Sequence, residues 1–140
     1  KDSEDTKIAI DKLQQFINTF PQSEFNDDAN ELIFELDYRL ELKEFNIALQ
    51  YNVLTDYQAA IKSFENFLID FPGSDLREKA MYYRFDSAYK LAINSVVWKQ
   101  KERIENAVSY FNSFKNSYND SELMGEMESK LSELSEINNI

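Results

Sequence analysis

The chain has 140 residues, and its 26 acidic and 15 basic side chains give a net charge of −11, which would repel nucleic acid and anionic lipid headgroups. It contains no cysteine and no histidine, which excludes thiol nucleophiles, Ser-His triads, zinc sites built on Cys or His, and haem ligation by either residue. Glycine and proline occur only twice each, too rarely for a β-sandwich or barrel with many tight turns. The composition therefore favours helices joined by short polar connections.

Apolar spacing predicts a helix in almost every part of the chain. The predicted helices span about residues 4–20, 25–42, 44–54, 57–71, 75–96, 102–118 and 121–138. Thr55 and Gln58 have the spacing of a capping box at the start of the fourth helix. Pro72 then ends that helix, and Ser74 can cap the next one. Short connections of this kind make neighbouring helices antiparallel.

The helix predicted at 75–96 carries apolar residues on two faces, so we expect it in the middle of the fold, buried on both sides. About nine residues around 95–102 follow it and are absent from the other repeats, so we expect an inserted connection there. The longest apolar runs fall short of the ~18 residues that a membrane span requires.

Three segments share one residue pattern at offsets of 60 − 9 = 51 and 107 − 60 = 47 residues. Each has an alanine followed by an aliphatic residue, then large apolar residues at helical spacing, an aromatic residue and a serine. The matching residues are Ala9, Ile10, Leu13, Phe16, Phe20 and Ser23; Ala60, Ile61, Phe64, Phe67, Phe71 and Ser74; and Ala107, Val108, Phe111, Phe114, Tyr118 and Ser121. We interpret them as structural repeats over about residues 4–43, 44–91 and 92–138.

The repeat centred on residues 44–72 resembles a tetratricopeptide repeat in its spacing of small and aromatic side chains. The residues that carry the resemblance are Ile47, Ala48, Tyr51, Ala60, Phe64, Phe67 and Pro72. This implies an all-α fold of stacked antiparallel helical hairpins, an α-solenoid, over a single domain at 1–140. The predicted core includes Phe64, Phe67, Phe71, Ala80, Tyr83, Ala88, Phe111 and Phe114.

In order, the motifs are similar to those of the BamD family, the outer-membrane barrel-assembly lipoproteins also called YfiO or ComL. The matching stretches are Phe20–Ser23, Asp27–Ala29, Leu36–Ala48, Asp56–Ile61, Phe71–Ser74 and Ala88–Ser95. They resemble the C-terminal half of the family, and the last stretch with its insertion resembles Bacteroidetes-type members. The lipid-anchor cysteine and first repeats of the family are absent from this chain, so we expect membrane contact only through an anchor that lies outside it.

The resemblance implies a protein-binding scaffold on the periplasmic face of the outer membrane, with the periplasmic domains of a BamA-like subunit as partner. Two alternatives stay open: a generic tetratricopeptide adaptor for a peptide or chaperone terminus, and a glycan-binding repeat lipoprotein. The carboxylate clamp of such adaptors needs Lys, Arg and Asn, which are scarce near residues 44–54. No catalytic, cofactor or metal site is predicted. Asp27 and Asp28 are adjacent on a helix and cannot flank one bond, and the oxygen-rich stretch 116–122 lacks the spacing of a calcium loop.

The best candidate for a partner contact is the group Val96, Val97 and Trp98. These three large apolar residues follow one another in the expected insertion, outside any clear helical stripe. Trp98 is the only tryptophan, a residue favoured at binding hot spots. The alternative is that Trp98 tucks back onto the helices beneath it.

Overall fold

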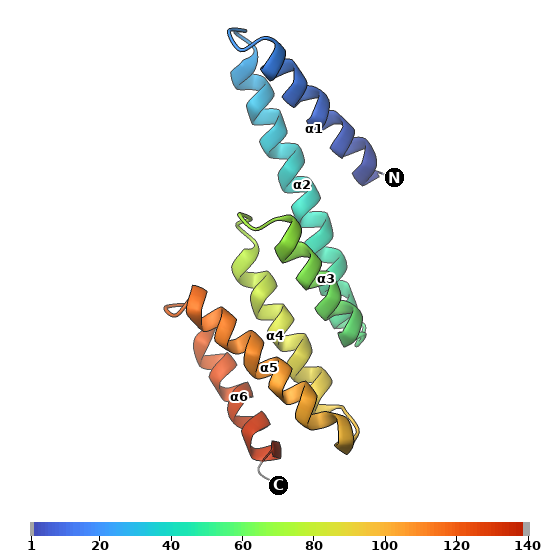
Figure 1. Ribbon diagram of the computed structural model, residues 1–140, viewed down its shortest axis with the longest axis vertical. Coiled ribbons are helices and arrows are strands. Elements are labelled where there is room, and N and C mark those ends of the chain that lie inside the picture. Colours follow the sequence, from blue (N-terminus) through green and yellow to red (C-terminus); the bar gives the residue numbers. More distant parts are fainter. Residues whose placement is uncertain (1, 139–140) are drawn as a thin grey trace. The chain divides into compact units, whose positions relative to one another are not determined.

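Regular structure in the computed structural model, which describes residues 2–138, is entirely helical. The helices in this range are α1 (Asp2–Thr19), α2 (Asn26–Val53), α3 (Tyr57–Asp70), α4 (Arg77–Ile93), α5 (Val97–Ser117) and α6 (Met124–Asn138) (Figure 1). The all-α fold of helical hairpins is therefore confirmed. Contacts divide the chain into an N-terminal unit, Lys1–Lys43, and a C-terminal unit, Glu44–Ile140. The single domain expected from the sequence stays a prediction.

Helix α2 corrects the expected boundary near residue 43. Two helices were predicted there, at 25–42 and 44–54, but α2 runs without interruption from Asn26 to Val53. Neither glycine nor proline occurs in this stretch, and Lys43 and Glu44 are good helix formers, so nothing breaks the backbone hydrogen-bond ladder.

The three turns α1–α2, α3–α4 and α5–α6 repeat the same hydrogen bonds. In the second turn the Phe71 N–H donates to the Phe67 carbonyl at 2.9 Å, the Ser74 N–H donates to the Phe71 carbonyl at 3.1 Å, and the Leu76 N–H donates to Ser74 Oγ at 3.0 Å. The corresponding distances are 2.9, 3.0 and 3.1 Å in the first turn and 2.8, 3.1 and 3.1 Å in the third. The repeated residue pattern therefore corresponds to a repeated backbone geometry.

The aromatic residues of these turns pair in the same way. The centroids of the ring pairs Phe16–Phe20, Phe67–Phe71 and Phe114–Tyr118 lie 5.4, 5.3 and 5.5 Å apart. Ser74 differs from its predicted role, because its side chain accepts a bond from Leu76, the residue that precedes α4, and does not cap the helix itself. It stabilises the turn ahead of the helix.

The connection between α2 and α3 also corrects a capping prediction. Asp56, one residue after Thr55, caps α3, and its Oδ1 accepts a hydrogen bond from the Ala59 N–H at 3.3 Å. Thr55 instead has a φ of 65°, in the left-handed region. Its N–H donates to the Asn52 carbonyl while the Asp56 N–H donates to the Tyr51 carbonyl. These two bonds form a Schellman motif that ends α2.

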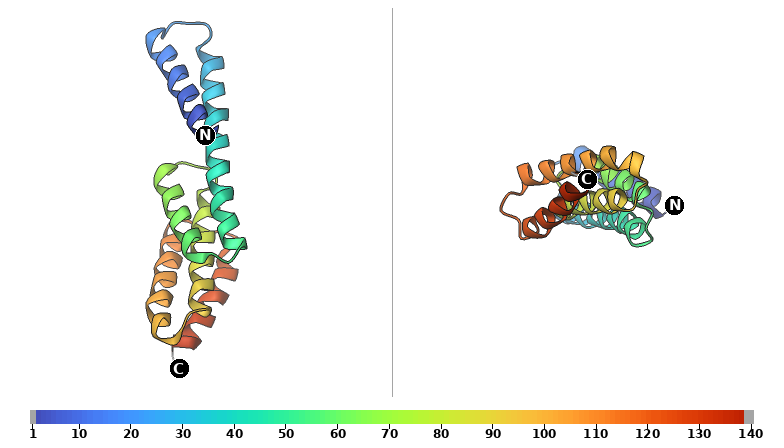
Figure 2. Two further views of the ribbon diagram at one scale, coloured as in Figure 1. Left: turned by 90° about the vertical axis from the view of Figure 1, so that its right-hand side faces the viewer. Right: turned by 90° about the horizontal axis from the view of Figure 1, so that it is seen from below.

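Helix α4 is central in the C-terminal unit and packs against α3, α5 and α6 (Figures 1 and 2). Its expected position in the middle is confirmed. Most of the predicted core is buried: Phe64, Phe67, Ala80, Ala88, Phe111 and Phe114. Phe71 and Tyr83 are only half-buried, contrary to the prediction, because each packs against the core on one side and borders solvent on the other.

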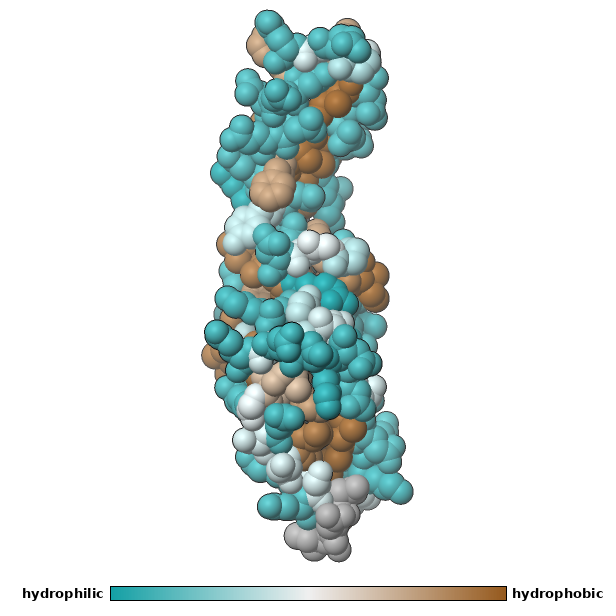
Figure 3. Space-filling model, turned by 90° about the vertical axis from the view of Figure 1, so that its left-hand side faces the viewer, coloured by the Kyte–Doolittle hydropathy of each residue, from teal (hydrophilic) through white to brown (hydrophobic). Residues whose placement is uncertain are grey.

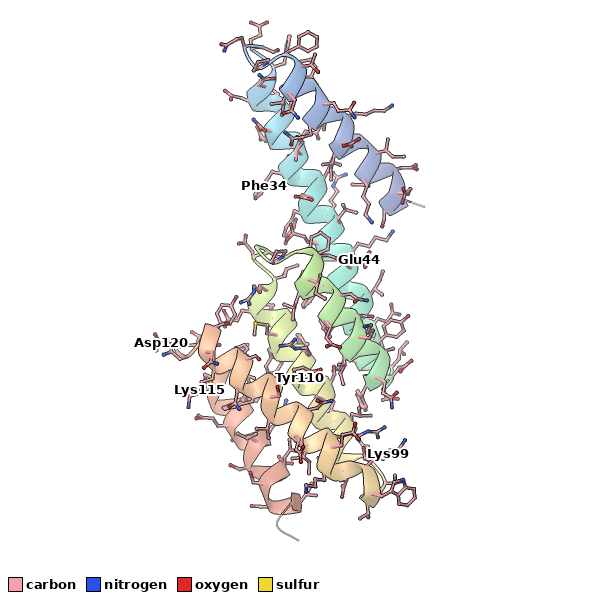
Figure 4. All side chains as sticks on the ribbon, viewed as in Figure 1. Phe34, Glu44, Lys99, Tyr110, Lys115 and Asp120 are labelled. Carbon is pink, nitrogen blue, oxygen red and sulfur yellow. The ribbon has the colours of Figure 1, made fainter. Side chains whose placement is uncertain are left out.

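The N-terminal unit has much less buried apolar surface. Ala29 and Leu40 are its buried hydrophobic residues among those the structure describes, and Phe16 is half-buried. Phe25 is 59% exposed and Phe34 is 73% exposed; Figure 4 shows Phe34 pointing outward from α2.

Candidate protein-binding surfaces

The segment with Val96, Val97 and Trp98 lies where α4 ends and α5 begins. A loop was expected over 95–102, but only residues 94–96 are non-helical, because α5 starts at Val97. Residues 97–102 contain no glycine or proline, so they extend the helix by more than one turn. The predicted insertion is therefore an N-terminal extension of α5.

This segment presents its apolar side chains to solvent. Val97 is 82% exposed and Trp98 81% exposed, with the less exposed Val96 and Ile93 beside them. The alternative in which Trp98 tucks back onto the helices is wrong. We call Ile93, Val96, Val97 and Trp98 the tryptophan patch.

Hydrogen bonds from α5 to the end of α4 and to the connection between the two helices hold the patch in place. Arg103 Nη1 donates to Ser95 Oγ at 2.6 Å, and Gln100 Nε2 donates to the Ala92 carbonyl at 3.5 Å. The Lys99 N–H donates to the Val96 carbonyl at 3.0 Å. Figure 4 labels Lys99 near the start of α5 and Asp120 in the α5–α6 turn, so the patch lies at the end of the helix remote from that turn. A fixed apolar surface loses little conformational entropy when a partner covers it.

A buried polar network that the sequence did not reveal joins α2, α4 and α6. Asp86 is 2% exposed and lies 2.7 Å from Lys130 Nζ and 2.9 Å from Lys90 Nζ. Asn52 Nδ2 donates to Asp86 Oδ2 at 3.1 Å and to Ser87 Oγ at 2.8 Å. The carboxylate is thus surrounded by donors from three helices.

Charge interactions decide the ionisation of this network. Burial alone would raise the pKa of Asp86, but hydrogen bonds from Lys130 and Lys90 outweigh it and hold the pKa below its ordinary value. Burial lowers the pKa of Lys130, yet hydrogen bonds to Asp86 and Glu126 outweigh that effect and raise it. Both groups are therefore charged at neutral pH, and their charges are mutually satisfied.

Tyrosine hydroxyls extend the network along α6. Tyr82 donates a hydrogen bond to Glu126, and Tyr89 donates to Glu133 at 2.6 Å. Lys130 Nζ lies 5.3 Å from the Tyr82 ring centroid and 5.5 Å from that of Tyr89. Burial and the bond to Glu133 raise the pKa of Tyr89 to about 12. Each charged group of the network makes a hydrogen bond within it, and the bonds join three helices, so we interpret the network as a structural link between helices.

Metal sites and membrane spans were also sought in the part of the chain that the structure describes. Over residues 2–138 no group of three acidic side chains could hold a metal ion, and Asp27 and Asp28 are exposed. Over the same residues no helix is both long and apolar enough to cross a membrane. The face drawn in Figure 3 is largely hydrophilic, with apolar side chains in separate patches.

Helical hairpins built from a repeated residue pattern define the class of helical-repeat proteins. Residues 1–102 match the family described as outer membrane lipoprotein, YfiO, and the chain belongs to that family. The resemblance to BamD proteins is thereby confirmed over α1 to α4 and the start of α5. No curated protein matches the sequence.

Proposed function

We propose that the chain is a non-enzymatic, protein-binding scaffold of the machinery that assembles β-barrel proteins in the outer membrane, and that it acts on the periplasmic face. The family match carries this proposal, because it covers most of the chain and names an outer membrane lipoprotein family. The net charge of −11 agrees with a protein partner, since it disfavours nucleic acid and anionic lipid surfaces.

The proposed partner is the periplasmic region of a BamA-like subunit, and the proposed contact is the tryptophan patch. Large exposed apolar residues that are held by a rigid helix start meet the requirements of an interface anchor. Trp98 and Val97 are more than four-fifths exposed, and a partner that covered them would remove most of their apolar surface from water.

Replacing Trp98 by alanine tests this proposal. We expect affinity for the BamA-like periplasmic domains to fall by at least ~2 kcal/mol, because a central aromatic anchor is lost. The free energy of unfolding should change by no more than about 0.5 kcal/mol, because the side chain is exposed. Calorimetric titration measures the affinity, and urea unfolding measures the stability.

Ile69→Ala is the matched control, because Ile69 is 75% exposed in the same unit but lies on α3, away from the patch. Its affinity should equal that of the parent chain. Equal affinities for Trp98→Ala and the parent would remove the patch from the interface. No binding by the parent chain itself would argue against the barrel-assembly role.

A further inference from the structure

A groove with aromatic walls lies on the C-terminal unit at the end of α4 opposite the tryptophan patch. Its apolar part is a hollow of about 230 Å³ between α2, α4 and the residue before α6. The lining residues are Phe45, Leu49, Lys79, Tyr82, Tyr83 and Leu123. This volume is below that of pockets for drug-sized ligands, so we expect the hollow to take a single side chain.

Packing against the core fixes the walls of the hollow. The Tyr83 ring stacks on Phe64 with a centroid distance of 6.0 Å and meets the edge of Phe45 at 6.1 Å. The Tyr82 ring is T-shaped to Tyr83 at 5.0 Å, and its hydroxyl is held by Glu126. The hollow is therefore preformed, and a ligand would not have to order it.

A larger, acidic hollow of about 520 Å³ adjoins the first one at Lys79 and Leu123, which line both. It lies between the α3–α4 and α5–α6 turns. Its four carboxylates face a single lysine, Lys79, and come from Asp75, Glu78, Asp120 and Glu122. Ser121 Oγ donates to Glu78 at 2.6 Å, while Asp75, Asp120 and Glu122 are exposed at the rim.

We propose that this groove binds a segment of a partner polypeptide in which one large apolar side chain is flanked by lysine or arginine. The apolar side chain would enter the hollow beside Leu49 and Tyr83, and the cations would lie against the acidic rim. The inference rests on the proposed function, a protein-binding scaffold, and specifies the chemistry of what is bound. Its polarity is opposite to that of a carboxylate clamp, because the groove presents carboxylates to the ligand.

Charge complementarity favours this occupant over the others that an apolar hollow could accept. A second copy of the chain would bring another net charge of −11 to an acidic rim. Lipid phosphates and nucleic acid would be repelled for the same reason. A basic segment instead gains attraction at the rim and burial in the hollow.

Selection from a random-peptide display library on the 140-residue chain tests the proposal without knowledge of the natural partner. Enriched peptides should carry a large apolar residue flanked by lysine or arginine. Replacement of that apolar residue by serine in a synthetic copy should weaken binding by about tenfold or more, since the burial of one side chain is lost. Binding should also weaken as salt concentration rises.

A pair of charge-reversed variants locates the site. Asp120→Lys with Glu122→Lys changes the rim and brings the net charge from −11 to −11 + 4 = −7. Glu102→Lys with Glu105→Lys gives the same net charge on exposed positions of α5. The rim variant should bind the selected peptide about tenfold more weakly, and the α5 variant should stay within about twofold of the parent.

Each other outcome overturns the proposal. Failure to enrich any peptide, enrichment of peptides without basic residues, or equal loss of affinity in the two charge-reversed variants would each show that the groove is not such a site. The barrel-assembly role is tested separately by the BamA-like domains. If the groove binds the selected peptide but the chain does not bind those domains, the peptide-binding groove is supported and the barrel-assembly role is contradicted.

Discussion

Asp86 is the residue whose position departs most from the rule that acidic side chains stay exposed. It is buried in α4 between Lys90, four residues on, and Lys130 of α6. A buried carboxylate is stable only when charged partners and hydrogen bonds replace its hydration. Here Asn52 supplies a further donor from α2. The residue therefore links three helices of the C-terminal unit.

Replacing Asp86 by asparagine should lower the free energy of unfolding by about 2 kcal/mol at pH 7, because hydrogen bonds between charged groups are lost. The folded pKa of Asp86 lies below its unfolded value near 3.8, so its ionised form adds stability above about pH 4. That stability is lost as pH falls through the folded pKa. The difference between parent and variant should therefore shrink at low pH.

Urea unfolding of both proteins at pH 7 and at about pH 3 measures this. The other carboxylates are common to both chains and cancel in the comparison. A difference that stays constant with pH would mean that Asp86 is stabilised by packing and not by its charge.

Sequence reasoning could not have found this network as a whole. The signal available was a carboxylate at position 86, directly after Phe85, with a lysine four residues later. The other partners, Asn52 and Lys130, are 34 and 44 residues away along the chain, and helical spacing says nothing about contacts at such separations. Only the packing of α2 and α6 against α4 brings them together.

Among the elements, the three repeated turns were the most predictable, because their aromatic and serine residues act within a few positions of each other. The hydrogen bonds at Ser23, Ser74 and Ser121 are all local, so the residue spacing predicts the turn, although it assigned Ser74 the role of a helix cap. The start of α5 was less predictable. Val97 and Trp98 do not fit the apolar stripe of the following helix, so the sequence favoured a loop there. Their backbone is nevertheless helical, and the two side chains are exposed at the start of α5.

The end of α2 contains a strained residue. Thr55 occupies the position of a Schellman motif that usually holds glycine, and its φ of 65° is unfavourable for a β-branched side chain. Replacing Thr55 by glycine should raise the free energy of unfolding by about 1 kcal/mol, since the steric cost of the left-handed conformation is removed.

Thermal or urea unfolding measures the gain, and Gly73→Ala provides a reference in which a glycine without positive φ is changed. That substitution meets open space, so it should be neutral or slightly stabilising. A destabilised Thr55→Gly chain would show that the threonine side chain contributes more than its conformation costs.

At the level of the whole molecule, the two units differ in how much apolar surface they bury. The C-terminal unit contains two hydrophobic clusters, one around Phe85 and Phe111 and the other around Phe64. The N-terminal unit leaves Phe25 and Phe34 more than half exposed. Local stability follows buried contacts, so the units should open with different free energies.

Native-state hydrogen exchange should therefore show faster exchange for amides in the middle of α1 than for those in the middle of α4, because opening α1 exposes less apolar surface. Mass spectrometry of peptides from the two helices provides the measurement. Equal protection of both helices would show that the chain opens as one cooperative body, as a single domain would.

The exposure of Trp98 also determines what the tryptophan fluorescence of this protein can measure. It is the only tryptophan and is 81% exposed in the folded state, so its indole is already in contact with water before unfolding. Its emission will consequently change little when the core is lost, and tyrosine signals or circular dichroism must follow folding instead. A partner that covers the patch will transfer the indole to an apolar setting and shift its emission to the blue, so the chain contains its own optical reporter of binding at that surface.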